Sequence, residues 1–228
     1  MKINGKPHRT IWLAADGWSV EVIEQTKLPH CFETLALRSA ADCARAIHTM
    51  QVRGAPLIGA TAAYGVAMAL RADPSDRHLS TTIELLARQR PTAVNLRWAL
   101  DEMHAAVARL SPRERAAAAY ARASQICDDD VESCRRIGVH GLELLKAHAA
   151  RKSSNEPVHV LTHCNAGWLA CVDWGTATAP IYQAHDAGMS IHVWVDETRP
   201  RNQGASLTAY ELGAHGVPHT IVVDNAGG

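Results

Sequence analysis

The sequence lacks an excess of charge of either sign and lacks long hydrophobic runs, and each absence excludes a class of protein. Its 23 basic residues balance 23 acidic ones, so the net charge indicates neither a nucleic-acid partner nor a membrane partner. The longest uncharged run, 54–70, is shorter than a bilayer span, contains Pro56 and is crowded with small residues. It therefore predicts a tightly packed internal helix, and a small molecule becomes the default ligand.

Paired cysteines and a secretory signal are also missing. The chain has six cysteines but no CxxC pair, which favours reduced thiols over a disulfide framework or a zinc site. Basic residues near the N-terminus are followed by neither an apolar stretch nor a small-residue cleavage site. We therefore expect a cytoplasmic protein without a bound metal.

The order of sequence patterns predicts two domains. Short apolar runs separated by turn residues continue to about Leu28 and predict a small antiparallel sheet. Helical patterns follow, with helix starts at Ser39 and at Ser111, where Glu114 completes a capping box. A polar stretch then separates an N-terminal β and helical domain, residues 1–152, from a second domain, residues 157–228.

The second domain alternates strand, helix, strand, helix and strand, which is typical of right-handed βαβ units. We expect an α/β protein in which the small N-terminal β and helical domain precedes an incomplete Rossmann-like parallel sheet with flanking helices. Three parallel strands alone leave apolar surface uncovered, so we expect the sequence to be a fragment truncated at its C-terminus.

Three strand ends carry the candidate chemistry. If these strands are parallel, Cys164, Asp196 and Asp224 lie along one edge of the sheet, where open α/β sheets bind ligands. A helix is predicted to begin directly after Cys164, and its N-terminus would favour the thiolate. Most cysteines are instead buried structural thiols, and that alternative stays open. The polar loop 196–204 is predicted to belong to the same site, although Asp196 could simply pair with Arg199 on the surface.

Three weaker patterns have plain alternatives. The segment 53–56, Arg-Gly-Ala-Pro, opens the small-residue helix and could hold a phosphate, but it could equally be an ordinary turn. Arg90 also precedes a helix, whose first turn could hold an anion. In isolation, however, this pattern is more typical of a solvated arginine at a helix start. His159 and His163 share a strand face, but no carboxylate stands at ligand spacing in the nearby sequence, which disfavours a metal site.

Five blocks together carry a family resemblance. These are VRGAPLIGATAAYGVA, RPTAVNLRWAL, LTHCNAGWLA, DETRPRNQGASLTAYEL and VVDNAGG. In this order they closely resemble methylthioribose-1-phosphate isomerases, from the first residue to the last. The superfamily also includes ribose-1,5-bisphosphate isomerase and the regulatory subunits of translation initiation factor 2B, which share the fold without the isomerase site.

The resemblance implies conversion of 5-methylthioribose 1-phosphate into 5-methylthioribulose 1-phosphate by a homodimer, without cofactor or metal. It implies Cys164 as the catalytic cysteine and a substrate site made by Arg53, Gly54, Ala55, Arg90 and Gln203. The family's second catalytic residue, an aspartate, lies downstream of the last block, and we expect Asp224 to orient site loops instead. Two alternatives remain: an isomerase of a related sugar phosphate, such as 5-deoxyribose 1-phosphate or ribose 1,5-bisphosphate, and a non-catalytic regulatory protein.

Overall fold

The computed structural model describes residues 1–3, 5–153 and 156–227, and the chain divides into two compact units. The first unit contains Met1–Arg9, Leu28–Cys31 and Val131–Gly228, and the second contains Thr10–Lys27 and Phe32–Asp130. The boundary predicted between residues 152 and 157 falls within the first unit and stays a prediction about folding domains. Residues 154 and 155 of the polar stretch, and Gly228, lie outside the described residues.

The second unit begins with the predicted antiparallel sheet. Its strands β3 (Ile11–Leu13), β4 (Val20–Ile23) and β5 (Thr34–Leu37) lie in the order β3-β4-β5. The sheet extends past the expected limit at Leu28, because β5 pairs with all four residues of β4. Val20 and Val22 of β4 are completely buried, which ties the sheet to the core.

The predicted helix starts are confirmed. Helix α1 (Ala40–His48) begins at Ser39, whose hydroxyl accepts the Asp42 N–H at 3.1 Å. After α3 (Asp76–Ala87) and α4 (Val94–Val107), α5 (Pro112–Ala149) begins at the capping box, where the Ser111 hydroxyl donates to Glu114 at 2.6 Å. Helix α5 is one element of 38 residues and contributes to both units.

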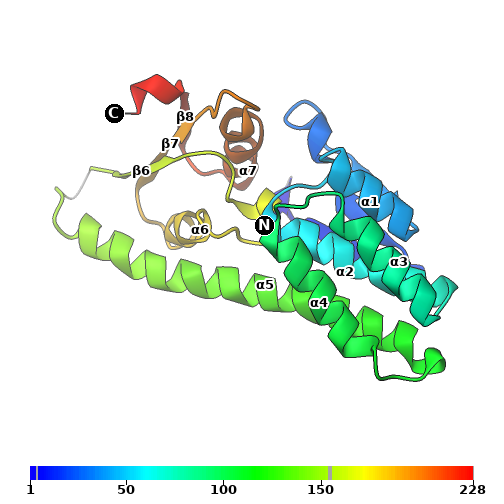
Figure 1. Cartoon of the computed structure of the whole chain (residues 1–228). Helices are drawn as coiled ribbons and strands as arrows, with labels where there is room; N and C mark the ends of the chain where they lie inside the picture. The colour runs from blue at the N-terminus through cyan, green and yellow to red at the C-terminus, as the bar shows by residue number, and fades with distance from the viewer. Residues whose placement is uncertain (4, 154–155, 228) are drawn as a thin grey trace. The chain divides into compact units, whose positions relative to one another are not determined.

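Helix α2 (Ala55–Ala72) is the predicted internal helix. All of its residues from Leu57 to Leu70 are buried, and it packs against α1, α3 and α4 (Figure 1). Within the described residues it is the one helix long and apolar enough to cross a bilayer, but 78% of it is buried inside the protein. Glycine allows close packing, since a Cβ on Gly59 would lie 3.1 Å from the Asn95 carbonyl oxygen of α4.

The first unit contains the predicted parallel sheet. Strands β6 (Val158–Thr162), β7 (Ile191–Asp196) and β8 (His219–Val222) lie in the order β6-β7-β8, and both pairs are parallel. Helices α6 (Ala179–Asp186) and α7 (Ala209–His215) connect them (Figure 1). A separate antiparallel pair, β1 (Lys2–Ile3) and β2 (Lys6–Pro7), completes the unit. The α/β fold class with small N-terminal sheets and a C-terminal parallel sheet is confirmed.

The sheet also has the expected uncovered apolar surface. Leu161, Trp194 and Ile221, one from each strand, are 51%, 37% and 48% exposed. The Trp194 ring stacks on His159 with centroids 6.0 Å apart and meets His192 at 4.9 Å. In contrast, Val193 and Val195 of β7 point to the opposite face and are completely buried, as the alternation of a strand requires.

Candidate active site at the ends of the parallel strands

Polar residues meet where the three parallel strands end. The Asp224 carboxylate after β8 accepts the backbone N–H groups of Arg199 and Thr198, each at 2.8 Å. The Arg199 N–H, followed by that of Thr198, holds the pKa of Asp224 below its usual value. Between the other two strands, His163 Nδ1 lies 3.2 Å from an oxygen of Asp196. The predicted gathering at one sheet edge is confirmed, and Asp224 makes the contacts expected of a residue that orients the loop after β7.

Cys164 has its backbone fixed on both sides. Its N–H donates to the Thr198 hydroxyl at 2.7 Å, and its carbonyl accepts the Thr208 hydroxyl at 2.7 Å. Its φ of 60° lies in the left-handed region, which costs an L-residue roughly 1–2 kcal/mol. Thr198 and Asn202 have φ of 54° and 52°, so three strained residues fall in one small region. Such clustering is typical of sites where the surrounding structure imposes a functional geometry.

The loop after β7 brings Gln203 to the cysteine. The Cys164 thiol lies 3.7 Å from Gln203 Oε1, which accepts its weak hydrogen bond. Gln203 directly precedes a π-helical turn, Gly204–Thr208, a feature frequent at functional sites. A Cβ on Gly204 would lie 1.7 Å from the Asp196 carbonyl oxygen, so glycine alone lets this turn pack on the end of β7. A cavity of about 170 Å³ adjoins Cys164 and is lined also by His163, Ala166, Thr178 and Thr208.

The prediction that a helix begins directly after Cys164 is wrong. The described chain there is extended and then forms a short 3-10 turn, Trp168–Ala170, and the next α-helix is α6, which starts at Ala179. The N–H groups of Trp168 and Leu169 in this turn donate to the carboxylate of Glu211, at 3.2 and 2.9 Å, and not to the sulfur. The thiolate prediction thereby loses its helix-dipole argument and stays a prediction.

Glu211 is the residue that sequence reasoning missed. It lies in α7, is 1% exposed, and burial raises its pKa to about 7 although the Leu169 N–H opposes the shift. One sequence signal could have found it. Glu211 lies on the same side of the helical segment as Leu207, one turn earlier, and next to Leu212, and both leucines are buried. Trp168, four residues after the cysteine, is completely buried and is not among the residues that line the cavity.

The other predicted binding residues lie in the second unit. Gly54 is the N-cap of α2 with φ of 91°, a conformation that favours glycine, and its carbonyl accepts the Ile58 N–H at 3.0 Å. Ala55 is the first helical residue, and Arg53 is 9% exposed. No side chain caps this helix start, so its first-turn N–H groups are suited to an anion.

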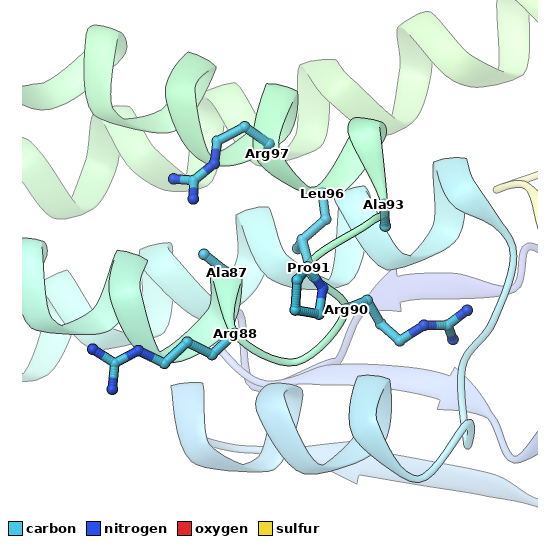
Figure 2. Close-up of a pocket in the computed structure, with 7 residues that line it drawn as sticks. All are labelled: Ala87, Arg88, Arg90, Pro91, Ala93, Leu96 and Arg97. Atoms are coloured by element: carbon cyan, nitrogen blue, oxygen red, sulfur yellow. The ribbon is translucent and has the colours of Figure 1, made fainter.

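Arg90 lies in the loop between α3 and α4. It lines a cavity of about 190 Å³ together with Arg88 and Arg97. Figure 2 shows that the guanidinium groups of Arg88 and Arg97 point away from that of Arg90. Arg88 binds Glu84 of its own helix at 3.3 Å. Helices α2 and α4 pack together at Gly59, in the second turn of α2, and Asn95, in the first turn of α4. Both predicted phosphate-binding segments therefore precede helices that meet near their N-termini. Of the predicted set, the structure thus brings Cys164 to Gln203, while the segment 53–55 and Arg90 belong to the other unit.

The chain belongs to the initiation factor 2 subunit family, whose profile matches residues 51–228. Within that class it is similar to methylthioribose-1-phosphate isomerases. Over the whole chain it is 60% identical to the isomerase of Methylocella silvestris and 62% identical to that of Acidiphilium cryptum. It spans 62% of the length of each of these relatives.

Two solved structures resemble the chain closely. The 5-methylthioribose 1-phosphate isomerase of Pyrococcus horikoshii matches with a TM-score of 0.85 and 35% identity, over 97% of this chain and 62% of that one. Translation initiation factor eIF-2B, subunit delta, from A. fulgidus matches with a TM-score of 0.83 and 37% identity, over 96% and 63%.

Proposed function

We propose that this chain carries the cysteine-bearing part of an aldose–ketose isomerase that converts 5-methylthioribose 1-phosphate to 5-methylthioribulose 1-phosphate. The observation that carries the proposal is the strained Cys164, held with its thiol 3.7 Å from Gln203 at the ends of the parallel strands. The names of the relatives at about 60% identity support the same reaction. Within the proposal, the protein is cytoplasmic, its parallel sheet is Rossmann-like, and it acts as a homodimer without cofactor or metal.

The proposed reaction rearranges atoms within one molecule. The bond between the ring oxygen and C1 breaks and the ring oxygen takes up a proton, while the hydrogen on C2 moves to C1. The C2 hydroxyl gives up its proton and becomes the carbonyl, so one proton enters and one leaves. Groups that donate and accept protons must therefore flank C1 and C2.

Cys164 would stand beside C1 and C2 in this scheme and either accept a proton or stabilise the transition state. Gln203 holds the thiol through its Oε1 and offers its amide N–H₂ to a substrate hydroxyl. The phosphate would bind at the uncapped start of α2, with Gly54 allowing close backbone approach, and Arg53 and Arg90 supplying charge.

A second candidate is a non-catalytic regulatory protein, favoured by the similarity to the A. fulgidus initiation factor subunit. A pure binding protein does not need a strained thiol in its ligand cavity, which favours the isomerase. A related sugar phosphate remains the third candidate.

The test is turnover of 5-methylthioribose 1-phosphate by the chain as given and by a version lengthened at the C-terminus to the size of its relatives. We expect the lengthened protein to form the ketose phosphate and Cys164→Ser to lower its kcat by about 100-fold or more, the usual scale for a group acting in proton transfer. The matched control is Cys31→Ser, which removes an exposed thiol and should leave turnover unchanged.

A folded lengthened protein that leaves this substrate unchanged would overturn the proposal. Turnover of ribose 1,5-bisphosphate or 5-deoxyribose 1-phosphate in its place would assign the related sugar-phosphate reaction. Normal turnover by Cys164→Ser would remove the cysteine from the reaction.

A further inference from the structure

The loop that follows Cys164 is anchored at two points by one short segment of the chain. Thr208 contacts the start of the loop, where its hydroxyl donates to the Cys164 carbonyl at 2.7 Å and accepts the Asn165 side-chain amide at 3.0 Å. Glu211, one helical turn later, contacts the far end of the loop, where it accepts the N–H groups of Trp168 and Leu169. Residues of the π-helical turn and of α7 therefore hold both ends of this loop by hydrogen bonds.

The fit between Glu211 and the loop leaves no free space. A Cβ on Gly167 would lie 1.4 Å from Glu211 Oε1, so the carboxylate occupies the place where a side chain would otherwise stand. On the other side, Gly175 bridges to Gly167, and a Cβ on Gly175 would lie 2.2 Å from the Gly167 carbonyl carbon. The Gly167 backbone is thus packed between Glu211 and Gly175, and loss of the carboxylate would leave two buried N–H donors without acceptors.

We propose that Glu211 is a positioning residue. It holds the segment 165–169 and thereby keeps the Cys164 backbone in its left-handed conformation, with the thiol facing Gln203. The contact of Glu211 with the loop stands on the structure alone, whereas its relevance to turnover rests on the proposed function. Glu211 is not among the residues that line the cavity and would act through the cysteine.

The charge state of Glu211 provides a way to observe this anchoring. Burial raises its pKa to about 7, so the carboxyl ionises near neutral pH in the folded chain. The titratable group that faces it is the Tyr182 phenol of α6, whose pKa is also raised by burial. The charge of Asp173, which binds the N-terminal ammonium, acts on the same phenol. On its own helix, His215 binds Asp186 at 2.9 Å. Because ionisation of a buried carboxyl favours exposure to water, opening of the loop should become easier as pH rises through 7.

The first experiment measures amide hydrogen exchange of residues 165–171 in the unmodified chain between pH 5.5 and 8.5, corrected for intrinsic rates. We expect protection to fall by about tenfold or more over this range, in line with the shifted pKa. In Glu211→Gln the profile should be flat, because glutamine does not titrate. The matched control, Glu143→Gln on the exposed face of α5, should keep the wild-type profile.

The second experiment follows alkylation of Cys164 by iodoacetamide, with Cys31 as the internal reference. We expect Glu211→Gln to change the Cys164 rate by about fivefold or more while Cys31 stays constant, because weakening the hydrogen bonds of Glu211 to Trp168 and Leu169 frees the loop that positions the thiol. In the lengthened protein the same variant should lower kcat with little change in KM.

A flat exchange profile in the unmodified chain, or an unchanged Cys164 rate in folded Glu211→Gln, overturns the inference. If the variant does not fold, the pH dependence of exchange and of Cys164 alkylation in the unmodified chain decides whether Glu211 holds the loop. Neither thiol nor exchange measurement needs substrate, so failure of the isomerase proposal would show separately as an absence of turnover.

Discussion

Two loops of this protein present backbone N–H groups in opposite ways. At the start of α2, the N-cap is Gly54 and no side chain caps the helix, so the N–H groups suit an external anion. After Cys164, the N–H groups of Trp168 and Leu169 already bind the buried Glu211. The first loop has the uncapped N–H groups that the proposed phosphate site requires, whereas the second uses its N–H groups to hold its own conformation.

The difference assigns separate tasks to two sequence segments that look alike. Both place small residues, Gly54-Ala55 and Ala166-Gly167, one or two positions after a proposed site residue, Arg53 or Cys164. In the first the glycine supplies a backbone φ of 91°. In the second Gly167 has an ordinary φ of −92°, and the absence of a Cβ makes room for a carboxylate. Four substitutions test this contrast.

The largest effect is expected for Gly167→Ala. Its new Cβ would collide with Glu211 on one side of a backbone already packed against Gly175, and we expect a loss of about 3 kcal/mol or more in the free energy of unfolding. Urea denaturation measures it. Gly213→Ala in α7, whose Cβ meets only His219 at 3.4 Å, is the control and should be neutral or stabilising. Equal stability of Gly167→Ala and wild type would show that the carboxylate does not fill this space.

The pH dependence of stability comes next. Folding raises the pKa of Glu211 from 4.5 to about 7, so between these pH values the folded chain binds more protons than the unfolded chain. The stability linked to this group is complete below pH 4.5 and is lost as pH rises through about 7. We expect the unfolding free energy of wild type relative to Glu211→Gln to fall by up to about 3 kcal/mol between pH 4.5 and 8. A constant difference across this range would contradict the raised pKa.

Gly54→Ala should have a smaller effect on stability and a specific effect on binding. Alanine at φ of 91° is strained, and we expect a loss of roughly 1–2 kcal/mol in the unfolding free energy. Gly17→Ala is the matched control, since its φ is 75° and nothing lies within 4 Å of the new Cβ. Both variants should lose stability, but only Gly54→Ala should weaken stabilisation of the chain by inorganic phosphate, followed by thermal unfolding. Equal phosphate responses in the two variants would remove Gly54 from the anion site.

The smallest effect on stability is expected at the start of α1, which is capped by the side chain of Ser39. Ser39→Ala removes the hydroxyl that accepts the Asp42 N–H, and the loss should be about 1 kcal/mol by urea denaturation. Phosphate should stabilise this variant as it does wild type, because α1 is not part of the proposed site. A change in its phosphate response would show that the start of α1 also contributes to anion binding.

Local signals in the sequence predicted much of the fold. The capping residues at Ser39 and Ser111, the buried helix from Gly54 and the three parallel strands were each confirmed, because capping and hydrophobic periodicity act over a few residues. The same reasoning failed after Cys164. Asn-Ala-Gly is compatible with a helix start, but tertiary contacts with Glu211 stabilise an extended loop there.

The sequence by itself determined the alternation of strands and helices along the second half of the chain, the placing of Cys164, Asp196 and Asp224 at strand ends, and the resemblance that indicates a sugar-phosphate isomerase. Only the tertiary structure decided that Gln203 meets the thiol and that Glu211, more than 40 residues after Trp168, holds the cysteine loop. Pairings over such separations depend on which side chains the folded core brings together and deprives of water. The pattern of neighbouring residues places Glu211 beside the apolar Leu207 and Leu212, but it does not encode which loop Glu211 meets. Burial against that loop is also what moves the pKa of Glu211 to about 7.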